Sequence, residues 1–265
     1  MDLTQLSHDL AALCRRTAEF IRQEAGTFDR GRVEHKGLHD LVSYVDQETE
    51  RRLVTGLREL LPEAGFITEE GTAGPDAHAE EFVWIIDPLD GTTNFVHGLP
   101  IYSISVALLQ HRELVVGVVH EVNRDESFRA VRGGGAFCNE QAIRVTDVAV
   151  LNNSLIATGF PYKDFGKMPA YLQLLGAFMS RSNGVRRLGS AAVDLAYVAA
   201  GRFEGFFEFN LNSYDVAAGI LLVREAGGQV TEFLTEGEPV FGREVVATNR
   251  HIHAEVQQTI AEFWQ

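Results

Sequence analysis

The stretch that decides the fold runs from Glu81 to Pro100 and reads EFVWIIDPLDGTTNFVHGLP. It opens with an apolar run, residues 82–86, which has the length and the β-branched content of a buried strand. Asp87 ends this run, and Asp90 follows three residues later, so two carboxylates lie at the mouth of a core strand. Burying ionised carboxylates costs free energy unless cations or hydrogen bonds compensate them. The stretch therefore predicts a strand whose acidic end needs a cation nearby.

The residues that follow Asp90 suit an anion. Gly91, Thr92 and Thr93 are small or carry hydroxyl groups, and their backbone N–H groups can face a negative charge. Carboxylates that hold cations, beside a turn that holds phosphate, indicate a metal-dependent enzyme acting on phosphoryl groups. The alternative explanation is that these Asp and Gly residues only form a turn, where both residue types are common. A turn alone, however, leaves the charges of the two acids at the strand end without compensation.

Length and charge narrow the classes of function. The 265 residues fit one large domain or two tightly joined subdomains, with a hydrophobic share of 45% that is typical of globular proteins. The formal net charge of −14 argues against broad binding to nucleic acid or to anionic membranes, whose phosphates would repel the chain. A small phosphate substrate remains compatible with this charge, because bound cations can reverse the local sign.

The sequence carries no signal for export or for a membrane. No stretch approaches the roughly 20 apolar residues of a membrane span, and residues 1–21 lack the features of a secretion signal. We therefore expect a cytoplasmic protein. Cys14 and Cys138 have no CxxC spacing, which favours two packed free thiols over a disulfide or a zinc site.

Hydrophobic periodicity predicts helices and then an antiparallel sheet in the first half of the chain. Helices are expected over 3–25 and 46–60, with a polar loop over 30–39 between them and a Gly-rich turn over 133–137. That turn lacks the GxGxxG spacing of a dinucleotide site. Strands are expected over 66–71, 82–86, 102–109, 114–119, 127–131 and 143–145.

The second half alternates strands and helices, which indicates an α/β arrangement. Strands are expected over 155–158, 203–209, 230–233 and 245–248, and helices over 169–179, 191–200, 215–226 and 253–263. We accordingly divide the chain into two predicted subdomains. Residues 1–148 form an α+β subdomain that carries the metal-binding motifs, and residues 149–265 form an α/β subdomain that completes the substrate site.

Three acidic clusters are candidates for cation binding: Glu69-Glu70 after a predicted strand, Asp87 with Asp90, and Asp215 before a predicted helix. Magnesium prefers hard oxygen ligands and keeps several waters, so a few carboxylates from separate segments suffice. The Leu89 carbonyl is a further oxygen within the motif. Taken alone, Asp215 is better explained as a helix N-cap, and Glu69-Glu70 as a solvated turn.

Together these segments resemble a known family. Trp84 to Phe95 is similar to the first signature of the inositol monophosphatase family, Ser213 to Gly219 resembles its second, and Glu69-Glu70 resembles its upstream acidic pair. The similarity continues in the family's order through residues 133–139, 186–192 and 225–228, and around residues 187–201 it is greatest to bacterial members. Where the family usually has Trp, this chain has Tyr214, which keeps an aromatic wall and adds a hydroxyl.

The resemblance implies a layered αβαβα sandwich of the sugar-phosphatase type, shared with fructose-1,6-bisphosphatase, and a homodimer. It implies a magnesium-dependent phosphomonoesterase that hydrolyses myo-inositol monophosphate, or a similar polyol phosphate, through a metal-activated water. Inhibition by lithium is expected for the same reason, through competition at a magnesium site.

The resemblance also assigns roles to residues of this chain. It implies that two or three Mg²⁺ ions are held, with Asp87 as the bridge, by Glu69, Asp87, the Leu89 carbonyl, Asp90 and Asp215. A weaker third ion would lie near Glu69, through water to Asp46. Glu69 and Thr92 would orient or deprotonate the attacking water, so the catalytic residues implied are Glu69, Thr92 and Asp87.

The same family pattern implies the substrate contacts. Gly91 and Thr92 would bind phosphate oxygens, and the full set of implied substrate-binding residues is Leu89, Asp90, Gly91, Thr92, Gly189, Ser190, Ala191, Glu208 and Asp215. A carboxylate at Glu208 suits the hydroxyl groups of a polyol, since it accepts hydrogen bonds; without the family, a surface acid is the simpler explanation. Arg187 is equally compatible with contacting an anionic substrate and with forming a salt bridge.

Two alternatives stay open. Phosphatases of the same fold act on fructose bisphosphate, NADP, histidinol phosphate or 3′-phosphoadenosine nucleotides, and the shared metal ligands cannot choose among these esters. Some bacterial relatives also bind the transcription machinery, which is a function of another class. The net charge of −14 weakens the case for direct contact with nucleic acid.

Overall fold

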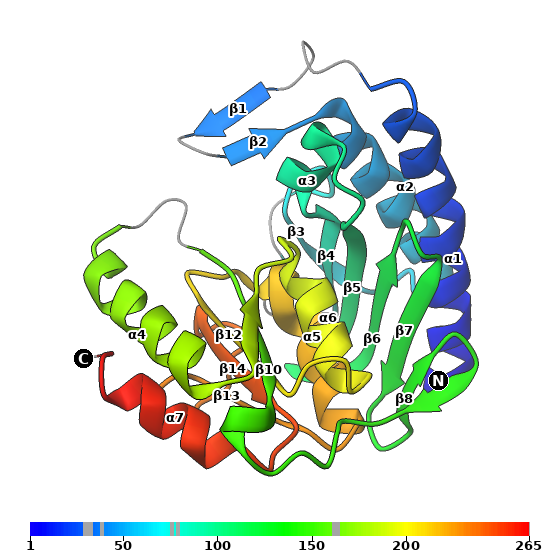
Figure 1. The fold of residues 1–265 in the computed structure, drawn as a ribbon. Coiled ribbons are helices and arrows are strands. Elements are labelled where there is room, and N and C mark those ends of the chain that lie inside the picture. Colours follow the sequence, from blue (N-terminus) through cyan, green and yellow to red (C-terminus); the bar gives the residue numbers. More distant parts are fainter. Residues whose placement is uncertain (29–33, 38–39, 75–76, 78–79, 161–164, 265) are drawn as a thin grey trace.

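The computed structural model describes residues 1–28, 34–37, 40–74, 77, 80–160 and 165–264. Helices and two sheets alternate in five layers (Figure 1). From one outer side to the other the layers are α1 (Leu3–Ala25) with α2 (Tyr44–Leu60), a seven-stranded sheet, α5 (Ala191–Ala199) with α6 (Ser213–Glu225), a five-stranded sheet, and α4 (Met168–Arg181) with α7 (His253–Ala261). The αβαβα order implied by the resemblance is confirmed.

The seven-stranded sheet follows the order of the sequence. Its strands are β3 (Gly65–Thr68), β4 (Phe82–Asp90), β5 (Ser103–Gln110), β6 (Glu113–Glu121), β7 (Glu126–Val131), β8 (Gly135–Cys138) and β9 (Gln141–Ile143). Neighbouring strands are antiparallel except β3 and β4, which are parallel. The predicted antiparallel sheet is thus confirmed for all pairs but that one.

The five-stranded sheet has the order β11 (Gly184–Arg186), β10 (Leu155–Thr158), β12 (Gly205–Phe209), β14 (Glu244–Thr248) and β13 (Gln229–Thr231). Strand β10 is parallel to both of its neighbours, and β14 is antiparallel to both of its own. A 3₁₀ helix, η2 (Leu151–Asn153), precedes this sheet. Residues of both halves of the chain share the core between the two sheets, and the subdomain division after residue 148 stays a prediction.

Every predicted helix and strand is present, and only β3 and β4 differ by more than two residues at an end. Two predictions were wrong in detail, and some short strands were not predicted. The loop expected over 30–39 contains β1 (Glu34–Gly37), which pairs with β2 (Asp40–Val42), while residues 30–33 and 38–39 lie outside the described residues. Part of the turn expected over 133–137 belongs to β8, and β11 was not predicted at all. These strands have three or four residues, too few to show alternation.

Strand β4 is central because its side chains enter two cores. Trp84 and Ile86 contribute to the core under α1 and α2, and Val83 and Ile85 to the core between the two sheets. None of the four is more than 4% exposed. Burying a side chain of this size stabilises a fold by roughly 1.5–3 kcal/mol, so the apolar run before Asp87 anchors both helical layers to the sheet.

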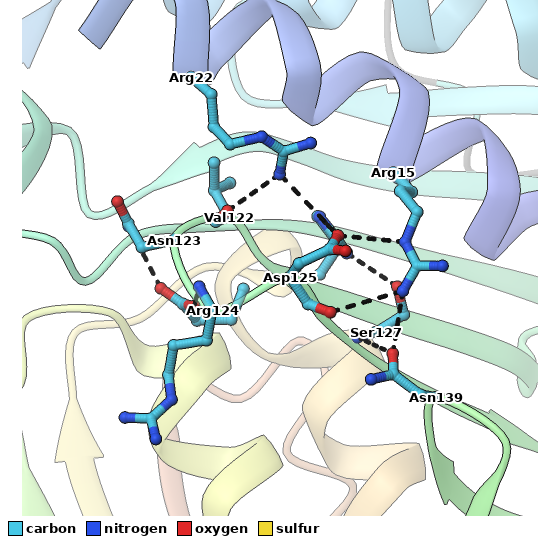
Figure 2. A network of polar contacts seen from close by, with 10 residues as sticks. Arg15, Arg22, Val122, Asn123, Arg124, Asp125, Ser127 and Asn139 are labelled. Atoms are coloured by element: carbon cyan, nitrogen blue, oxygen red, sulfur yellow. Dashed lines mark hydrogen bonds and ion pairs between the residues drawn. The ribbon is translucent and has the colours of Figure 1, made fainter. Parts of the chain in front are cut away.

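A polar network ties α1 to the turn between β6 and β7 (Figure 2). Arg15 Nε donates to Asp125 Oδ1 at 3.1 Å, and Arg22 Nη1 donates to the Val122 carbonyl at 3.0 Å. Arg15 also reaches Asn139 Oδ1 at 3.1 Å. Exposed ion pairs of this kind contribute about 1 kcal/mol or less, so the packing of α1 depends mainly on its buried side chains.

Cys14 is buried and Cys138 half-buried, and both are free thiols, as expected. Among the described residues, no helix combines the length and the apolar character that crossing a membrane requires.

His120 lies fully buried on β6, next to Asp125 of the polar network that holds α1. Its Nδ1 is 2.8 Å from Ser127 Oγ and its Nε2 is 3.7 Å from Asp125 Oδ1. Burial is the largest cause that lowers the pKa of His120 to about 4, so the ring is neutral in the folded protein near neutral pH.

We expect His120 to make stability fall as the pH drops. The unfolded chain takes up a proton at His120 near pH 6.5, whereas the folded protein does so only near pH 4. The stability contributed above pH 6.5 is therefore lost between pH 6.5 and 4. Relative to His120→Gln, the wild type should lose about 3 kcal/mol of unfolding free energy from pH 7 to 4, measured by urea denaturation. Identical pH profiles for both proteins would contradict this.

Candidate active site

Strand β4 carries the acidic motif past the point where the sequence predicts its end. Asp87 pairs with Ser105 and Asp90 with Ser103, so β4 has one extra residue between these two pairs. This bulge accommodates Pro88, which has no N–H to donate to a ladder. Both acids are consequently held by a paired strand, which positions side chains more tightly than a loop does.

Carboxylates from three segments gather around Asp87. The Asp87 side chain is 2% exposed. Burial raises the pKa of its carboxyl well above the usual range, and the neighbouring charges of Glu69, Asp90 and Asp215 raise this pKa further. Glu69 directly follows β3, and its N–H donates to the Ile86 carbonyl at 3.2 Å. The structure thus brings the candidate metal ligands of the sequence to one place.

Asp90 connects β4 to the start of α5. Its Oδ2 accepts a hydrogen bond from Ser190 Oγ at 2.6 Å and one from the Ala192 N–H at 2.8 Å. Ser190 is also the N-cap of α5, since its hydroxyl accepts from the Val193 N–H. Burial raises the pKa of Asp90 to about 6, although the two hydrogen bonds counteract this shift. Asp90 therefore orders the loop in which substrate contacts were expected.

Asp46 and Thr92 form a direct contact that the sequence did not reveal. Thr92 Oγ1 lies 2.7 Å from Asp46 Oδ1 and 3.0 Å from the Leu89 carbonyl. The other oxygen of Asp46 accepts from Ser43 N and Oγ at 2.9 and 2.6 Å, as the capping box of α2. Asp46 is 1% exposed, and burial raises its pKa. The pattern Ser-x-x-Asp signals a helix start, so it did not disclose the second partner.

Gly91 begins the short helix α3 (Thr92–His97) in a conformation that requires glycine. Its φ is +98°, and a Cβ there would lie 3.1 Å from the Ile101 carbonyl and 3.2 Å from the Gly189 carbonyl. Asn94 Nδ2 donates to the carbonyls of Ile101 and Leu188 at 2.7 and 2.9 Å. The turn after β4 therefore packs tightly against the loop before α5.

Asp215 lies in the first turn of α6. Taken alone it was interpreted as an N-cap, and this interpretation was wrong by three residues. Asn212 is the N-cap, and its N–H donates to Asp215 Oδ2 at 2.6 Å. This capping box directs the Asp215 carboxylate back toward the helix N-terminus, on the side where its charge reaches Asp87 and Glu208.

The side of the site expected to hold the alcohol also contains buried acids. Glu208, on β12, is 8% exposed, so the simpler interpretation as a surface acid was wrong. Burial is the largest cause that raises its pKa to about 8, and the nearby Asp215 charge adds to the shift. Its carboxylate packs so closely against Gly159 that any Cβ at that position would collide with it.

Asp194, one helical turn beyond Ser190, is a further buried acid that sequence reasoning missed. Burial raises its pKa well above the usual range, and the charges of Glu208 and Asp90 raise it further. The guanidinium of Arg187 counteracts the shifts of all three acids. Arg187 is therefore a nearby positive charge that partly offsets these buried acids.

The donor set fits a hard divalent cation. In the part of the chain that the structure describes, no group of three or more His, Cys, Asp or Glu side chains is already arranged as a metal site. Magnesium takes fewer protein ligands than a closed cage supplies, because it retains waters and binds substrate phosphate oxygens. The mutual repulsion around Asp87 is the structural observation that fits a cation, since a divalent ion would compensate these charges.

Comparisons with known proteins identify the family of this chain. A model described as the inositol monophosphatase family matches residues 2–265. An inositol-1-monophosphatase of Rhizobium meliloti is 43% identical over 91% of this chain and 90% of the relative. A putative Nus factor SuhB of Neisseria meningitidis serogroup B is also 43% identical, over 93% of this chain and 94% of the relative.

Solved structures of similar proteins have the same fold as this chain. The extragenic suppressor protein suhB of Bartonella henselae superposes with a TM-score of 0.89 at 37% identity, over 96% of this chain and 97% of that one. An IMPase of Thermotoga maritima superposes with a TM-score of 0.87 at 36% identity, over 99% of this chain and 98% of that one.

Replacing Asp87 by Asn is expected to stabilise the metal-free protein. Asn cannot ionise, so the variant loses the repulsion from three carboxylates, and its amide can donate to one of them. In EDTA at pH 7.5 the Tm should rise by roughly 2–4 °C for each kcal/mol gained. Adding Mg²⁺ should then raise the Tm of the wild type by ligand linkage and leave that of Asp87→Asn unchanged, as measured by calorimetry. A variant that is less stable than the wild type in EDTA would argue against repulsion at Asp87.

Proposed function

The chain belongs to the inositol monophosphatase family, and we propose that it is a magnesium-dependent phosphomonoesterase. The proposed substrate is myo-inositol monophosphate or a similar polyol phosphate, and the products are the alcohol and inorganic phosphate. One observation carries the proposal: three acids from β4 and two other segments surround the buried Asp87 carboxyl. The relative named inositol-1-monophosphatase supports the substrate class.

We assign the cation ligands by position in the motifs. One ion would be held by Glu69, Asp87 and the Leu89 carbonyl, and a second by Asp87, Asp90 and Asp215. Bound there, Mg²⁺ would offset the phosphate charge and lower the pKa of the attacking water. The Asp90 oxygen that accepts from Ser190 and Ala192 is held in a fixed orientation, which leaves its other oxygen for the ion.

Thr92 and Asp46 supply the protein's own path for the proton. Thr92 Oγ1 can accept a hydrogen bond from the attacking water while it donates its own proton to Asp46 Oδ1, 2.7 Å away. Burial raises the pKa of Asp46 and so makes its carboxylate a better proton acceptor. We therefore add Asp46 to Glu69 and Thr92 as a residue that orients and deprotonates the water.

The phosphate and the alcohol would contact different elements. The first N–H groups of α3 have no acceptor within the helix, so phosphate oxygens would accept from the N–H groups of Gly91, whose φ is +98°, and Thr92. Glu208 and Asp90 would accept hydrogen bonds from the alcohol hydroxyls. Gly189, with a φ of +95°, lets the loop before α5 approach Asn94 and Arg187 closely.

Rates of phosphate release with Mg²⁺ test this proposal. We expect the highest kcat/KM on myo-inositol monophosphate in a panel that also contains fructose bisphosphate, NADP, histidinol phosphate and a 3′-phosphoadenosine nucleotide. Lithium should inhibit the reaction. Asp87→Asn should lower kcat by roughly 10²–10³-fold or more, while Asp147→Asn, the same change at a 71% exposed side chain, should not.

Equal turnover by the wild type and Asp87→Asn would sink the catalytic assignment. A clear preference for another ester of the panel would move the assignment to one of the same-fold alternatives. The homodimer expected from the resemblance is checked independently by light scattering.

A second candidate is the role in binding the transcription machinery, because several relatives carry the name Nus factor SuhB. The two roles separate in a strain that carries Asp87→Asn in place of the wild-type gene. If that strain grows like the wild type while a deletion strain does not, binding is the role that matters for growth. If both strains share one defect, catalysis is that role.

A further inference from the structure

Glu50 is a buried acid that the proposed reaction does not use. It lies on α2 one helical turn after Asp46 and is 0% exposed. Its Oε2 accepts the Glu70 N–H at 2.8 Å, and its Oε1 accepts the Thr72 N–H at 2.7 Å. A carboxylate is tolerated at such a depth only when hydrogen bonds compensate its charge, and here both oxygens are occupied by one turn of backbone.

That turn carries Glu69. Strand β3 ends at Thr68, and the N–H of Glu69 still donates to the Ile86 carbonyl of β4 at 3.2 Å. The following residues leave the sheet, and Glu50 binds them through two charge-assisted hydrogen bonds, which are stronger than neutral ones. Glu69 is therefore held on one side by the sheet and on the other by α2.

We propose that Glu50 is a positioning residue that holds Glu69 against Asp87 through the backbone N–H groups of Glu70 and Thr72, and thereby sets the affinity for the divalent cation. The inference rests on the proposed function. In this proposal α2 positions two parts of the site from one helical turn: Asp46 accepts a hydrogen bond from the Thr92 hydroxyl, and Glu50 binds the turn that carries Glu69. One buried helix face thus aligns two segments that approach the site from different strands.

The chain contains a matched control for this interaction. Glu225 binds the turn before β8 in the same way, because its two oxygens accept the N–H groups of Gly133 and Gly135 at 2.8 and 2.9 Å. Glu225 is the last residue of α6, ten residues after Asp215, which is about 15 Å along a helix. Glu225→Gln therefore removes the same kind of turn contact far from the acidic site.

Amide hydrogen exchange tests the positioning directly. In the wild type, the amides of Glu70 and Thr72 should exchange more slowly than that of Gly74, whose bond to the Gly71 carbonyl is 3.4 Å long. Glu50→Gln keeps the volume but places an amide NH₂ against a backbone N–H. We expect it to speed exchange at Glu70 and Thr72 by roughly tenfold or more.

Magnesium binding and turnover then separate positioning from general stability. By calorimetric titration, Glu50→Gln should weaken Mg²⁺ binding several-fold, and the half-activating Mg²⁺ concentration should rise by the same factor. Its kcat should fall by roughly 10- to 100-fold. Glu225→Gln should lower the Tm yet leave Mg²⁺ affinity and kcat within about twofold of the wild type.

Several outcomes would overturn the inference. These are unchanged Mg²⁺ affinity in Glu50→Gln, or the same loss of affinity in Glu225→Gln. If Glu50→Gln does not fold, the wild type alone tests the inference: equal exchange rates for the Thr72 and Gly74 amides would contradict it. A wild type that binds Mg²⁺ but hydrolyses no phosphate ester would defeat the proposed function, while the exchange and titration results would still judge Glu50.

Discussion

The repulsion around the buried Asp87 carboxylate is the constraint on which the rest of the structure depends. Burial and the charges of Glu69, Asp90 and Asp215 all disfavour its ionised form. Like charges gathered in a core destabilise a fold unless protons or cations compensate them. The fold bears much of this cost at the end of β4, where the apolar run before Asp87 anchors two cores at once.

Backbone N–H groups of the elements around this point hold several of the acids in fixed orientations. Asp90 accepts from the start of α5, Asp215 from the start of α6, and Asp46 from the start of α2. Helix N-termini favour negative charge, so three helices contribute to the tolerance of this acidic cluster. In enzymes the residues of a functional site commonly lower the stability of the fold in this way.

The αβαβα layering, and the grouping of Glu69 and Asp215 with Asp87, were implied by the family resemblance. The helices, most of the strands and the two acids of β4 were predicted from local patterns of the sequence. The apolar run of β4 is contiguous, and the motif residues keep a fixed spacing. Three contacts could not be predicted from the sequence, because each joins residues 20 to 100 positions apart. They are Asp46 with Thr92, Asp90 with Ser190, and Glu50 with Glu70. Asp46 was further concealed by its capping box, and Asp194 by the apolar helix that surrounds it.

A crystal grown with Mn²⁺ tests the central claim most directly, because Mn²⁺ accepts the oxygen ligands of Mg²⁺ and its anomalous scattering locates it. The account predicts peaks in contact with the Asp87 carboxylate, one on the side of Glu69 and one between Asp90 and Asp215. Density for Mn²⁺ only elsewhere, with the Asp87 carboxylate bound to neighbouring side chains instead, would contradict it.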